Sequence, residues 1–435
     1  MYNNKKILIE GIDKIGIAVA KLLAPDNHIL LTDTKCDDEK LIQELENLGI
    51  NVVITKNQAK LLNEKYDYLI KNLEISNGND IVKKAETLNI PIVNEMQVAY
   101  TFLPQKVNVV GITGSNGKAT IAHLTYEILK LAEMPVKIAD NINTPLSSII
   151  KQIKPNDILL LEISSHQFLK KSNTNINVLT NLNPVHLDML KTYENYKKNN
   201  NYPNREIAIL NRNDNQIVSL AKDISSEELY ITNKNISDFC IKDKKIYYKN
   251  EEVCSLNDIR LKGKHNYENV MCSILLAKHF NISNEIIKEA LDNFSGVEHH
   301  LEFVRRLNER EFYNDSKSTN NKSTIIAIQS FETPIILLLG GLDRGQNFDE
   351  LSDYTKNIKS IICFGETKQK IQDFCQKNSI DVTALDSLEE ATRLAYNTSE
   401  EGDTILLSPA CASWDQFKDF EERGVKFKEI VESLQ

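Results

Sequence analysis

The hydrophobic pattern of the chain alternates between two periods, and this alternation predicts an α/β protein. Short, continuous apolar runs such as Ile158–Ile163 have the length and composition of buried strands in a parallel sheet. Other segments carry apolar residues at helical spacing, as in the series Ile121, Leu124, Ile128 and Leu131. The two patterns succeed one another along all 435 residues, a length that suggests about three domains. We place these domains at 1–98, 99–297 and 298–435.

The first 98 residues predict a Rossmann-like domain. A strand at Ile7–Ile9 leads through a turn into a helix at Ile17–Leu23, and a second strand ends at Asp33. The turn reads G-I-D-K-I-G, so Asp13 takes the middle glycine position of a dinucleotide fingerprint, where its charge repels a pyrophosphate. NAD binding is therefore disfavoured. Binding of another nucleotide and a purely structural role stay open.

A glycine-rich loop in the second region predicts a phosphate-binding site of the P-loop type. The stretch Val107–Thr120 reads VNVVGITGSNGKAT, which is a short apolar strand, a loop with three glycines, Lys118, and then a helical pattern. In such a loop the backbone N–H groups and the helix dipole face phosphate, and the lysine neutralises its outer oxygens. The general pattern is G-x-x-x-x-G-K-[ST], but Ile112 stands at its first glycine and Ala119 at its hydroxyl position. An ordinary glycine turn is the alternative to nucleotide binding.

Polar residues at the ends of other predicted strands mark a ligand-facing edge. Glu162 lies near the end of the run ILLLEI, and a carboxylate at that place suits Mg²⁺, although a solvated strand end would look the same. His186 follows a further strand, where it is either a ligand or a capped loop histidine. The third region repeats the α/β pattern and is predicted to be a second Rossmann-like domain. Three of its strands run into small, polar or basic residues, in the stretches 315–320, 340–345 and 408–413.

Composition narrows the classes of partner. The net charge of −9 and the sequence pI near 5.6 argue against nucleic acid or an anionic membrane as the main partner. No apolar stretch approaches the length of a membrane span, and the N-terminus does not have the pattern of a signal peptide. The seven cysteines include no C-x-x-C pair, which favours reduced thiols in a cytoplasm over a metal–thiolate site. We expect a cytoplasmic monomer.

A series of motifs in this order resembles one enzyme family, the Mur ligases. The motifs are GITGSNGK, LEISS, HLD, KHNYEN, NDSKSTN, GGLDRG and LSPACASWDQFKDFEERG. The last of them is the most specific and resembles the branch of the family that adds D-glutamate. The resemblance implies three domains, which bind the UDP end of the substrate, ATP and D-glutamate in turn. It also implies that ATP, with Mg²⁺, activates the carboxylate of UDP-N-acetylmuramoyl-L-alanine as an acyl phosphate, which the amine of D-glutamate attacks.

The same resemblance implies roles for individual residues. Those expected to carry the chemistry are Lys118, Glu162, His186 and Lys317, with Glu162 and His186 as metal ligands. Those expected to bind ATP are Gly114, Ser115, Asn116, Gly117, Lys118, Ala119, Thr120, Asn269 and Asp315. Those expected to bind the other two substrates are Asp33, Thr34, Asn141, Thr319, Arg344, Ser413 and Phe420.

The chain also departs from the family pattern at several of these places. Besides Ala119, Val185 replaces an acidic residue before His186, and Asn200 replaces a lysine that the family carbamylates to bridge its metals. His300 replaces an arginine, and the stretch 72–74 replaces a Ser-Pro-Gly turn. Two hypotheses therefore remain: a working but divergent ligase, and a non-catalytic relative that binds a nucleotide sugar or a cell-wall partner. A sister ligase that adds another amino acid fits the C-terminal motif poorly.

Overall fold

The structure is a computed structural model that describes residues 2–72, 75, 78–114, 116–140, 144–163, 174–181, 207–215, 217–218, 227–232, 239–263 and 265–435. The chain forms two compact units, Met1–Lys118 with Leu129–Tyr230 and Ala119–Ile128 with Ile231–Gln435. The division falls inside one helix, so it does not coincide with the domain boundaries at 98 and 297, which stay predictions.

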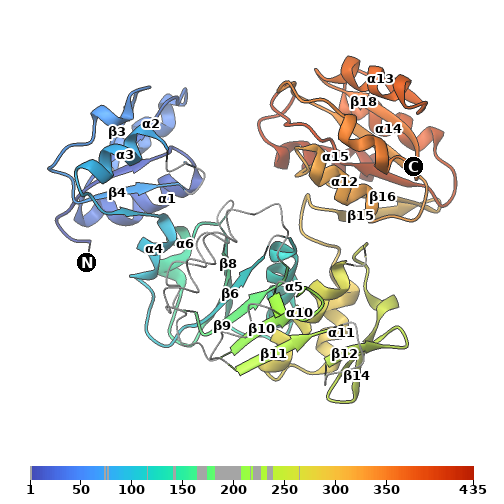
Figure 1. Ribbon diagram of the computed structural model, residues 1–435, viewed down its shortest axis with the longest axis horizontal. Helices are drawn as coiled ribbons and strands as arrows, with labels where there is room; N and C mark the ends of the chain where they lie inside the picture. Colours follow the sequence, from blue (N-terminus) through green and yellow to red (C-terminus); the bar gives the residue numbers. More distant parts are fainter. Residues whose placement is uncertain are drawn as a thin grey trace. The chain divides into compact units, whose positions relative to one another are not determined.

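The N-terminal part of the first unit is a parallel five-stranded sheet in the order β3-β2-β1-β4-β5 (Figure 1). Its strands are β1 Lys6–Glu10, β2 His28–Asp33, β3 Asn51–Ile54, β4 Tyr68–Lys71 and β5 Ile92–Val93. The helices of this part are α1 Lys14–Leu23, α2 Glu39–Asn47, α3 Asp80–Thr87 and α4 Glu95–Tyr100, with 3-10 turns at Ala24–Asp26 and Gln58–Lys60. Apolar side chains that alternate along the strands build two buried clusters, as the Rossmann-like prediction requires.

Helix α1 begins three residues before the predicted Ile17, because Asp13 acts as its N-cap. The Asp13 carboxylate accepts hydrogen bonds from the backbone N–H groups of Ile15 and Gly16, at 2.9 and 2.8 Å. The residue that breaks the dinucleotide fingerprint thus starts the helix.

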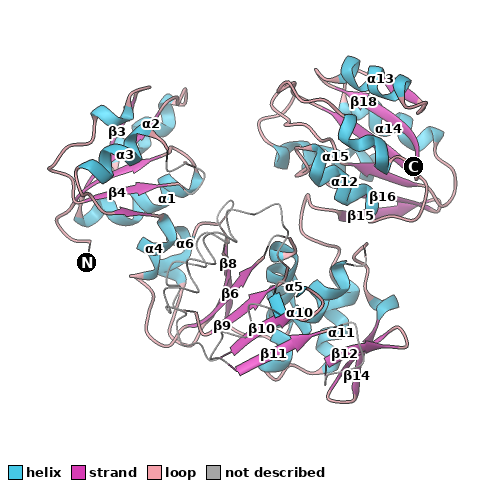
Figure 2. Cartoon of the chain, in the orientation of Figure 1, coloured by secondary structure: helices cyan, strands magenta, loops and turns pink. Residues whose placement is uncertain are grey.

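The second sheet of the first unit has the order β11-β10-β9-β6-β8-β7. Its strands are β6 Asn108–Thr113, β7 Val136–Ala139, β8 Ile158–Glu162, β9 Ile176–Leu179, β10 Ile207–Asn211 and β11 Glu227–Ile231. Helix α5 Lys118–Leu131 follows β6 along the chain, with residues 119–128 in the second unit, and α6 Leu146–Ile149 leads into a 3-10 turn at Ile150–Gln152. Strand β6 lies between β8 and β9 and runs parallel to both, so the three carboxyl ends lie side by side at one edge of the sheet (Figure 2).

The second unit contains a small antiparallel sheet and two helices before its large sheet. Strands β12 Phe239–Lys242, β13 Lys245–Tyr248 and β14 Glu251–Ser255 pair in order, followed by a 3-10 turn at Leu256–Asp258 and by α10 His265–His279 and α11 Asn284–Asn293. Lys249 and Asn250 form the β13–β14 hairpin turn with positive φ angles of 49° and 67°.

The C-terminal sheet has the order β15-β16-β20-β17-β18-β19, and all neighbours are parallel except β15 and β16. Its strands are β15 Glu302–Leu307, β16 Arg310–Asn314, β17 Ile335–Gly340, β18 Ile358–Phe364, β19 Val382–Ala384 and β20 Thr404–Leu407. Its helices are α12 Asn321–Gln329, α13 Lys368–Lys377, α14 Leu388–Thr398 and α15 Phe420–Ser433, with a 3-10 stretch at Asp349–Tyr354. Two buried clusters pack these helices on the sheet. Because β16, β20 and β17 are neighbours, the three predicted ligand-facing stretches start at one edge.

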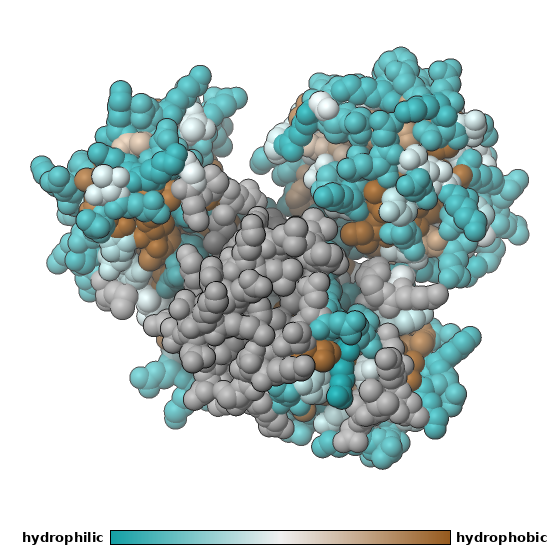
Figure 3. Space-filling model, viewed as in Figure 1, coloured by the Kyte–Doolittle hydropathy of each residue, from teal (hydrophilic) through white to brown (hydrophobic). Residues whose placement is uncertain are grey.

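None of the helices among the described residues is long and apolar enough to cross a membrane. The described surface seen in Figure 3 is largely hydrophilic, with apolar side chains in small patches.

Candidate active site

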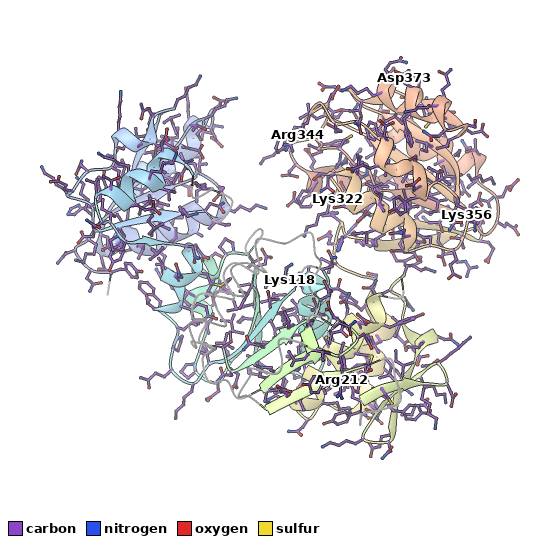
Figure 4. All side chains as sticks on the ribbon, in the orientation of Figure 1. Lys118, Arg212, Lys322, Arg344, Lys356 and Asp373 are labelled. Atoms are coloured by element: carbon purple, nitrogen blue, oxygen red, sulfur yellow. The ribbon has the colours of Figure 1, made fainter. Side chains whose placement is uncertain are left out.

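The phosphate loop between β6 and α5 is held in shape by its own glycines and by its lysine. Gly114 and Gly117 have φ angles of 141° and 87°, which L-residues with side chains rarely adopt. Lys118 opens α5 (Figure 4), and its ammonium donates a hydrogen bond to the carbonyl of Gly114 at 2.7 Å. The lysine therefore lies against the loop backbone, next to N–H groups at the helix N-terminus, which is the arrangement that binds phosphate.

The end of β9 fastens this loop from the other side. Thr180 donates its hydroxyl to the carbonyl of Asn116 at 2.7 Å, and the Asn181 side chain accepts the backbone N–H of Asn116 at 2.9 Å. A Cβ on Gly114 would lie 2.0 Å from the Thr180 hydroxyl oxygen, so this position requires glycine. The loop is thus organised by residues that no phosphate-loop pattern contains.

Gly111, which stands beside the missing first glycine of the motif, has a packing role. A Cβ there would lie 2.8 Å from the Ile163 side chain and 2.9 Å from those of Thr174 and Asn177. The strand needs glycine at this position to pack closely on its neighbours.

Glu162 ends β8 directly beside the loop strand. It pairs with Ile112 of β6, two residues before Gly114, and its side chain is half-buried. The adjacent Thr113 hydroxyl is buried and has no hydrogen-bond partner among the described residues. No group of three or more His, Cys, Asp or Glu side chains that could hold a metal occurs in the described part of the chain. This edge fits a Mg²⁺ ion bound by one carboxylate, phosphate oxygens and waters, since Mg²⁺ is commonly held by one or two carboxylates plus substrate phosphates.

The other residues predicted to bind the nucleotide are mostly buried in the structure. Thr120 is buried in the first turn of α5, and Ala119 beside it has no hydroxyl. Asn269 is buried in α10 and donates its side-chain amide to Asn266 at 2.9 Å. Asp315, expected at the ATP ribose, is only 1% exposed.

The Asp315 carboxylate is occupied by contacts inside the C-terminal domain. It accepts hydrogen bonds from the Ser408 hydroxyl at 2.7 Å and the Leu301 N–H at 3.1 Å, and His300 lies 3.5 Å away. Asp315 therefore ties β16 to the start of the 408–413 stretch, and its role at the ribose stays a prediction. His300, which replaces an arginine, is within ion-pairing reach of this carboxylate when protonated.

A pocket of about 600 Å³ in the C-terminal domain brings together two residues predicted for D-glutamate, Thr319 and Arg344. Lys322, Gln346, Glu350 and Ala410 also line it. Lys322 lies in the first turn of α12, and Figure 4 shows it on the same side of the domain as Arg344. Two cations beside one carboxylate suit a ligand with two carboxylates and one ammonium group. The sequence pattern gave no reason to select Lys322, because its distance from Arg344 depends on the fold.

Arg344 also contacts a residue outside the predicted set. Its guanidinium lies over the ring of Trp414, 4.3 Å from the ring centroid, and its backbone N–H donates to the Gln346 side chain at 2.8 Å. Trp414 is 61% exposed. A cation–π contact of this kind holds a long, mobile guanidinium in one place.

The remaining predicted glutamate residues lie on segments that are joined to one another. The backbone N–H of Lys317 donates to the carbonyl of His299 at 3.0 Å. The carbonyl of Phe420, the first residue of α15, accepts the Ser316 hydroxyl at 2.8 Å. Ser413 is 2% exposed, and its hydroxyl has no partner among the described residues.

In the N-terminal sheet, the Asp33 carboxylate lies at the carboxyl end of β2. It accepts hydrogen bonds from the backbone N–H groups of Ile12 and Thr34, at 2.8 and 2.6 Å. Asp13 accepts a further bond from the Asn72 amide at 2.6 Å, so the N-terminus of α1 is filled by a protein carboxylate. Thr34 is exposed beside Asp33, where both could meet a ligand.

The chain matches one family over its full length. Residues 112–277 match the Mur ligase middle domain and residues 299–411 the Mur ligase glutamate ligase domain. The chain is 40% identical to the UDP-N-acetylmuramoylalanine–D-glutamate ligase of Bacillus cereus strain G9842, over 100% of this chain and 98% of that protein. The corresponding ligase of Bacillus anthracis strain A0248 gives the same values. The chain belongs to the Mur ligase family, in its D-glutamate-adding branch.

Solved structures confirm the three-domain α/β fold of the Mur ligases. The UDP-N-acetylmuramate-alanine ligase MurC from Thermotoga maritima has a TM-score of 0.64 at 16% identity, over 99% of this chain and 100% of that one. The murein peptide ligase Mpl from Psychrobacter arcticus has a TM-score of 0.53 at 14% identity, over 98% and 99%. At these identities the likeness concerns the fold alone.

Seven positions at which this Mur ligase was expected to bind ligands or depart from the family lie outside the described residues. They are Leu73, Glu74, Ser115, Asn141, Val185, His186 and Asn200. The roles of all individual site residues stay predictions.

Proposed function

We propose that this chain catalyses the ATP-dependent addition of D-glutamate to UDP-N-acetylmuramoyl-L-alanine in peptidoglycan precursor synthesis. The observation that carries the proposal is the 40% identity to D-glutamate ligases over the full chain. Two features of the structure support the proposal. The loop that carries Lys118 has the form of a phosphate-binding loop, as a nucleotide site requires, and the pocket lined by Arg344 offers cations for a dicarboxylate.

ATP transfers its terminal phosphoryl group to the alanyl carboxylate, which gives an acyl phosphate and ADP. The amine of D-glutamate then attacks the acyl carbon, the resulting tetrahedral intermediate expels phosphate, and the amine loses a proton as the amide forms. Both steps bring anions together, so the protein contributes charge neutralisation and positioning.

In this proposal Lys118 and the loop from Gly114 to Thr120 bind the phosphates of ATP. Glu162 and His186 hold Mg²⁺, which neutralises phosphate charge when bound. Asn269 and Asp315 serve the nucleoside, and Asp33, Thr34 and Asn141 serve the UDP substrate. The D-glutamate site consists of Lys317, Thr319, Arg344, Ser413 and Phe420.

We infer that the enzyme works in the cytoplasm as a monomer. Its seven cysteines are free, and six of them are buried, as suits a reducing compartment.

The decisive experiment measures phosphate release with UDP-N-acetylmuramoyl-L-alanine, D-glutamate, ATP and Mg²⁺, and with each of them omitted in turn. We expect release only when all four are present, together with a product heavier by one glutamate residue. Binding of the nucleotide sugar without any turnover would instead identify a non-catalytic relative.

A further inference from the structure

A buried arginine of α15 is hydrogen-bonded to Ser316, next to Lys317 of the proposed D-glutamate site. Arg423, one turn after Phe420 in α15, is 0% exposed and is the largest fully buried side chain of the described protein. No carboxylate of the described residues forms an ion pair with it, although the charges of Asp415 and Asp315 are near enough to stabilise its charged form in part. Burial lowers the pKa of its guanidinium to about 10, so the group stays charged at neutral pH. A buried cation that is hydrogen-bonded but has no carboxylate in direct contact is unusual, so we ask what its position contributes to the site.

The guanidinium fastens the segment that carries Lys317 and Thr319. Its Nε donates to the Ser316 hydroxyl at 2.9 Å, and its Nη2 donates to the Ser316 carbonyl at 2.8 Å. The Ser316 hydroxyl in turn donates a hydrogen bond to the Phe420 carbonyl at 2.8 Å. One planar group therefore fixes the lysine segment against the start of α15 through a closed set of hydrogen bonds.

The third nitrogen of the same group faces the other two segments of the site. Nη1 is buried and has no hydrogen-bond partner among the described residues. It lies 3.2 Å from the position that a Cβ on Gly341 would take, and Gly341 begins the stretch that leads to Arg344. The same Cβ would lie 2.3 Å from the carbonyl oxygen of Ala412, next to Ser413. The stretches 315–319, 341–345 and 411–415 thus converge on this guanidinium.

We propose that Arg423 is a positioning residue for D-glutamate, which holds these three segments together and places a fixed positive charge under the substrate carboxylates. This inference rests on the proposed function, since it concerns the same site. A preorganised charge of this kind favours an anionic ligand without reorganisation when it binds. Lysine cannot replace arginine fully here, because it lacks the planar fork that bonds both Ser316 oxygens.

The test compares Arg423→Met and Arg423→Lys with the wild type in steady-state kinetics. We expect Arg423→Met to raise the KM for D-glutamate by at least about tenfold, because hydrogen bonds to a charged group are lost. The KM values for ATP and UDP-N-acetylmuramoyl-L-alanine should stay within about twofold. Arg423→Lys should recover part of the effect, because it keeps the charge.

The matched control is Phe427→Leu, which alters a fully buried residue one turn further along α15 in the apolar cluster around Phe312. It should lower the Tm without a change in the KM for D-glutamate. If Arg423→Met does not fold, Ser316→Ala offers a milder test, because it removes the hydroxyl that Nε and Phe420 share. It should raise the same KM by a smaller factor.

An unchanged KM for D-glutamate in folded Arg423 variants, or a change equal to that of Phe427→Leu, would overturn the inference and leave the proposed function intact. A wild-type protein that neither releases phosphate nor binds D-glutamate in equilibrium dialysis would overturn the proposed function, and the inference with it.

Discussion

The guanidinium of Arg344 lies over the indole of Trp414, with 4.3 Å from the guanidinium carbon to the ring centroid. Trp414 is the single tryptophan of the chain, and Arg344 lines the pocket proposed for D-glutamate. A carboxylate in that pocket competes with the ring for the guanidinium, since an ionic hydrogen bond is stronger than an exposed cation–π contact.

We therefore predict that D-glutamate changes the tryptophan emission of the protein in a saturable way. Fluorescence titration of the protein with nucleotide and UDP-N-acetylmuramoyl-L-alanine present measures the effect, with L-glutamate as the stereochemical control. Arg344→Met should raise the D-glutamate concentration that gives the half-maximal response by at least about tenfold. Constant emission at D-glutamate concentrations that saturate turnover would show that Arg344 does not move on binding.

Lys118→Ala should abolish turnover and leave the fold intact. The ammonium lies against the loop that is proposed to hold the phosphates, and its loss removes a charge aimed at the developing negative charge, which costs about 100-fold or more in kcat. Lys130→Ala is the matched control, because this lysine is exposed in the last turn of the same helix. Turnover and ATP affinity equal to the wild type in Lys118→Ala would contradict the phosphate-loop assignment.

Lys317→Met should raise the KM for D-glutamate or remove activity, with ATP binding affected less. Lys317 is fixed by its backbone bond to His299 on the segment that Arg423 holds, and its charge suits a substrate with two carboxylates. Lys356→Met is the control, because Lys356 is exposed and Figure 4 shows it on the side of the C-terminal domain away from Arg344. Labelled D-glutamate that binds equally well to both variants would place the site elsewhere.

Glu10 predicts a pH dependence of stability in the N-terminal sheet. It is 7% exposed at the end of β1, and one of its carboxylate oxygens has no partner among the described residues. Burial raises the pKa of Glu10 from 4.5 to about 7, the Asp33 carboxylate adds to the rise, and Lys71 opposes it. The folded state thus favours the protonated form. The stability that this proton provides is fully present below pH 4.5 and is lost as the pH rises through 7.

Glu10→Gln imitates the protonated form, so it should unfold at a higher temperature than the wild type at pH 8 and at the same temperature near pH 4.5. The gain in free energy of unfolding is at most about 3 kcal/mol. Thermal unfolding of both proteins from pH 4.5 to 8 measures it. A difference in Tm that does not vary with pH would mean that Glu10 does not titrate in this range.

The sequence pattern predicts helices and strands well where a run of apolar residues is enough to determine the secondary structure. The run ILLLEI is a strand because its apolar side chains can be buried on both faces, and β8 ends at Glu162, one residue before the end of the predicted run. The predicted start of α1 was wrong by three residues, because Asp13 was interpreted as a defect in a glycine motif although it is a helix cap. Both readings concern the same carboxylate, and only the backbone geometry distinguishes them.

Site residues could be predicted only where a motif names them. Arg344 and Thr319 were assigned by resemblance, and they line one pocket. Lys322, Trp414 and Arg423 were not selected, because each matters through a neighbour that is distant along the chain. The sequence alone does not distinguish a buried arginine such as Arg423 from one on the surface. Which face of α15 is buried depends on how the helix packs on the sheet.

The last prediction concerns Ala119, where the chain departs from the phosphate-loop pattern. The hydroxyl usual at this place binds Mg²⁺, and its absence leaves Glu162 as the one predicted metal ligand among the described residues. We therefore expect a high Mg²⁺ requirement. Ala119→Thr should lower the Mg²⁺ concentration at half-maximal turnover by about 10- to 100-fold, the usual effect of one contact near a metal.

Ala119→Val separates the hydroxyl from the added volume, because valine has the shape of threonine without its oxygen. It should leave the Mg²⁺ requirement unchanged or raise it, since Ala119 lies in the first turn of α5 next to the buried Thr120. Turnover against Mg²⁺ concentration for the three proteins decides the matter, and Mg²⁺-dependent binding of a fluorescent ATP analogue gives a second readout. Wild-type turnover that is already saturated at micromolar Mg²⁺ would show that another group fills the place of the hydroxyl. In that case Ala119→Thr gains nothing, because a further oxygen ligand would compete with a bound water for a position that is already taken.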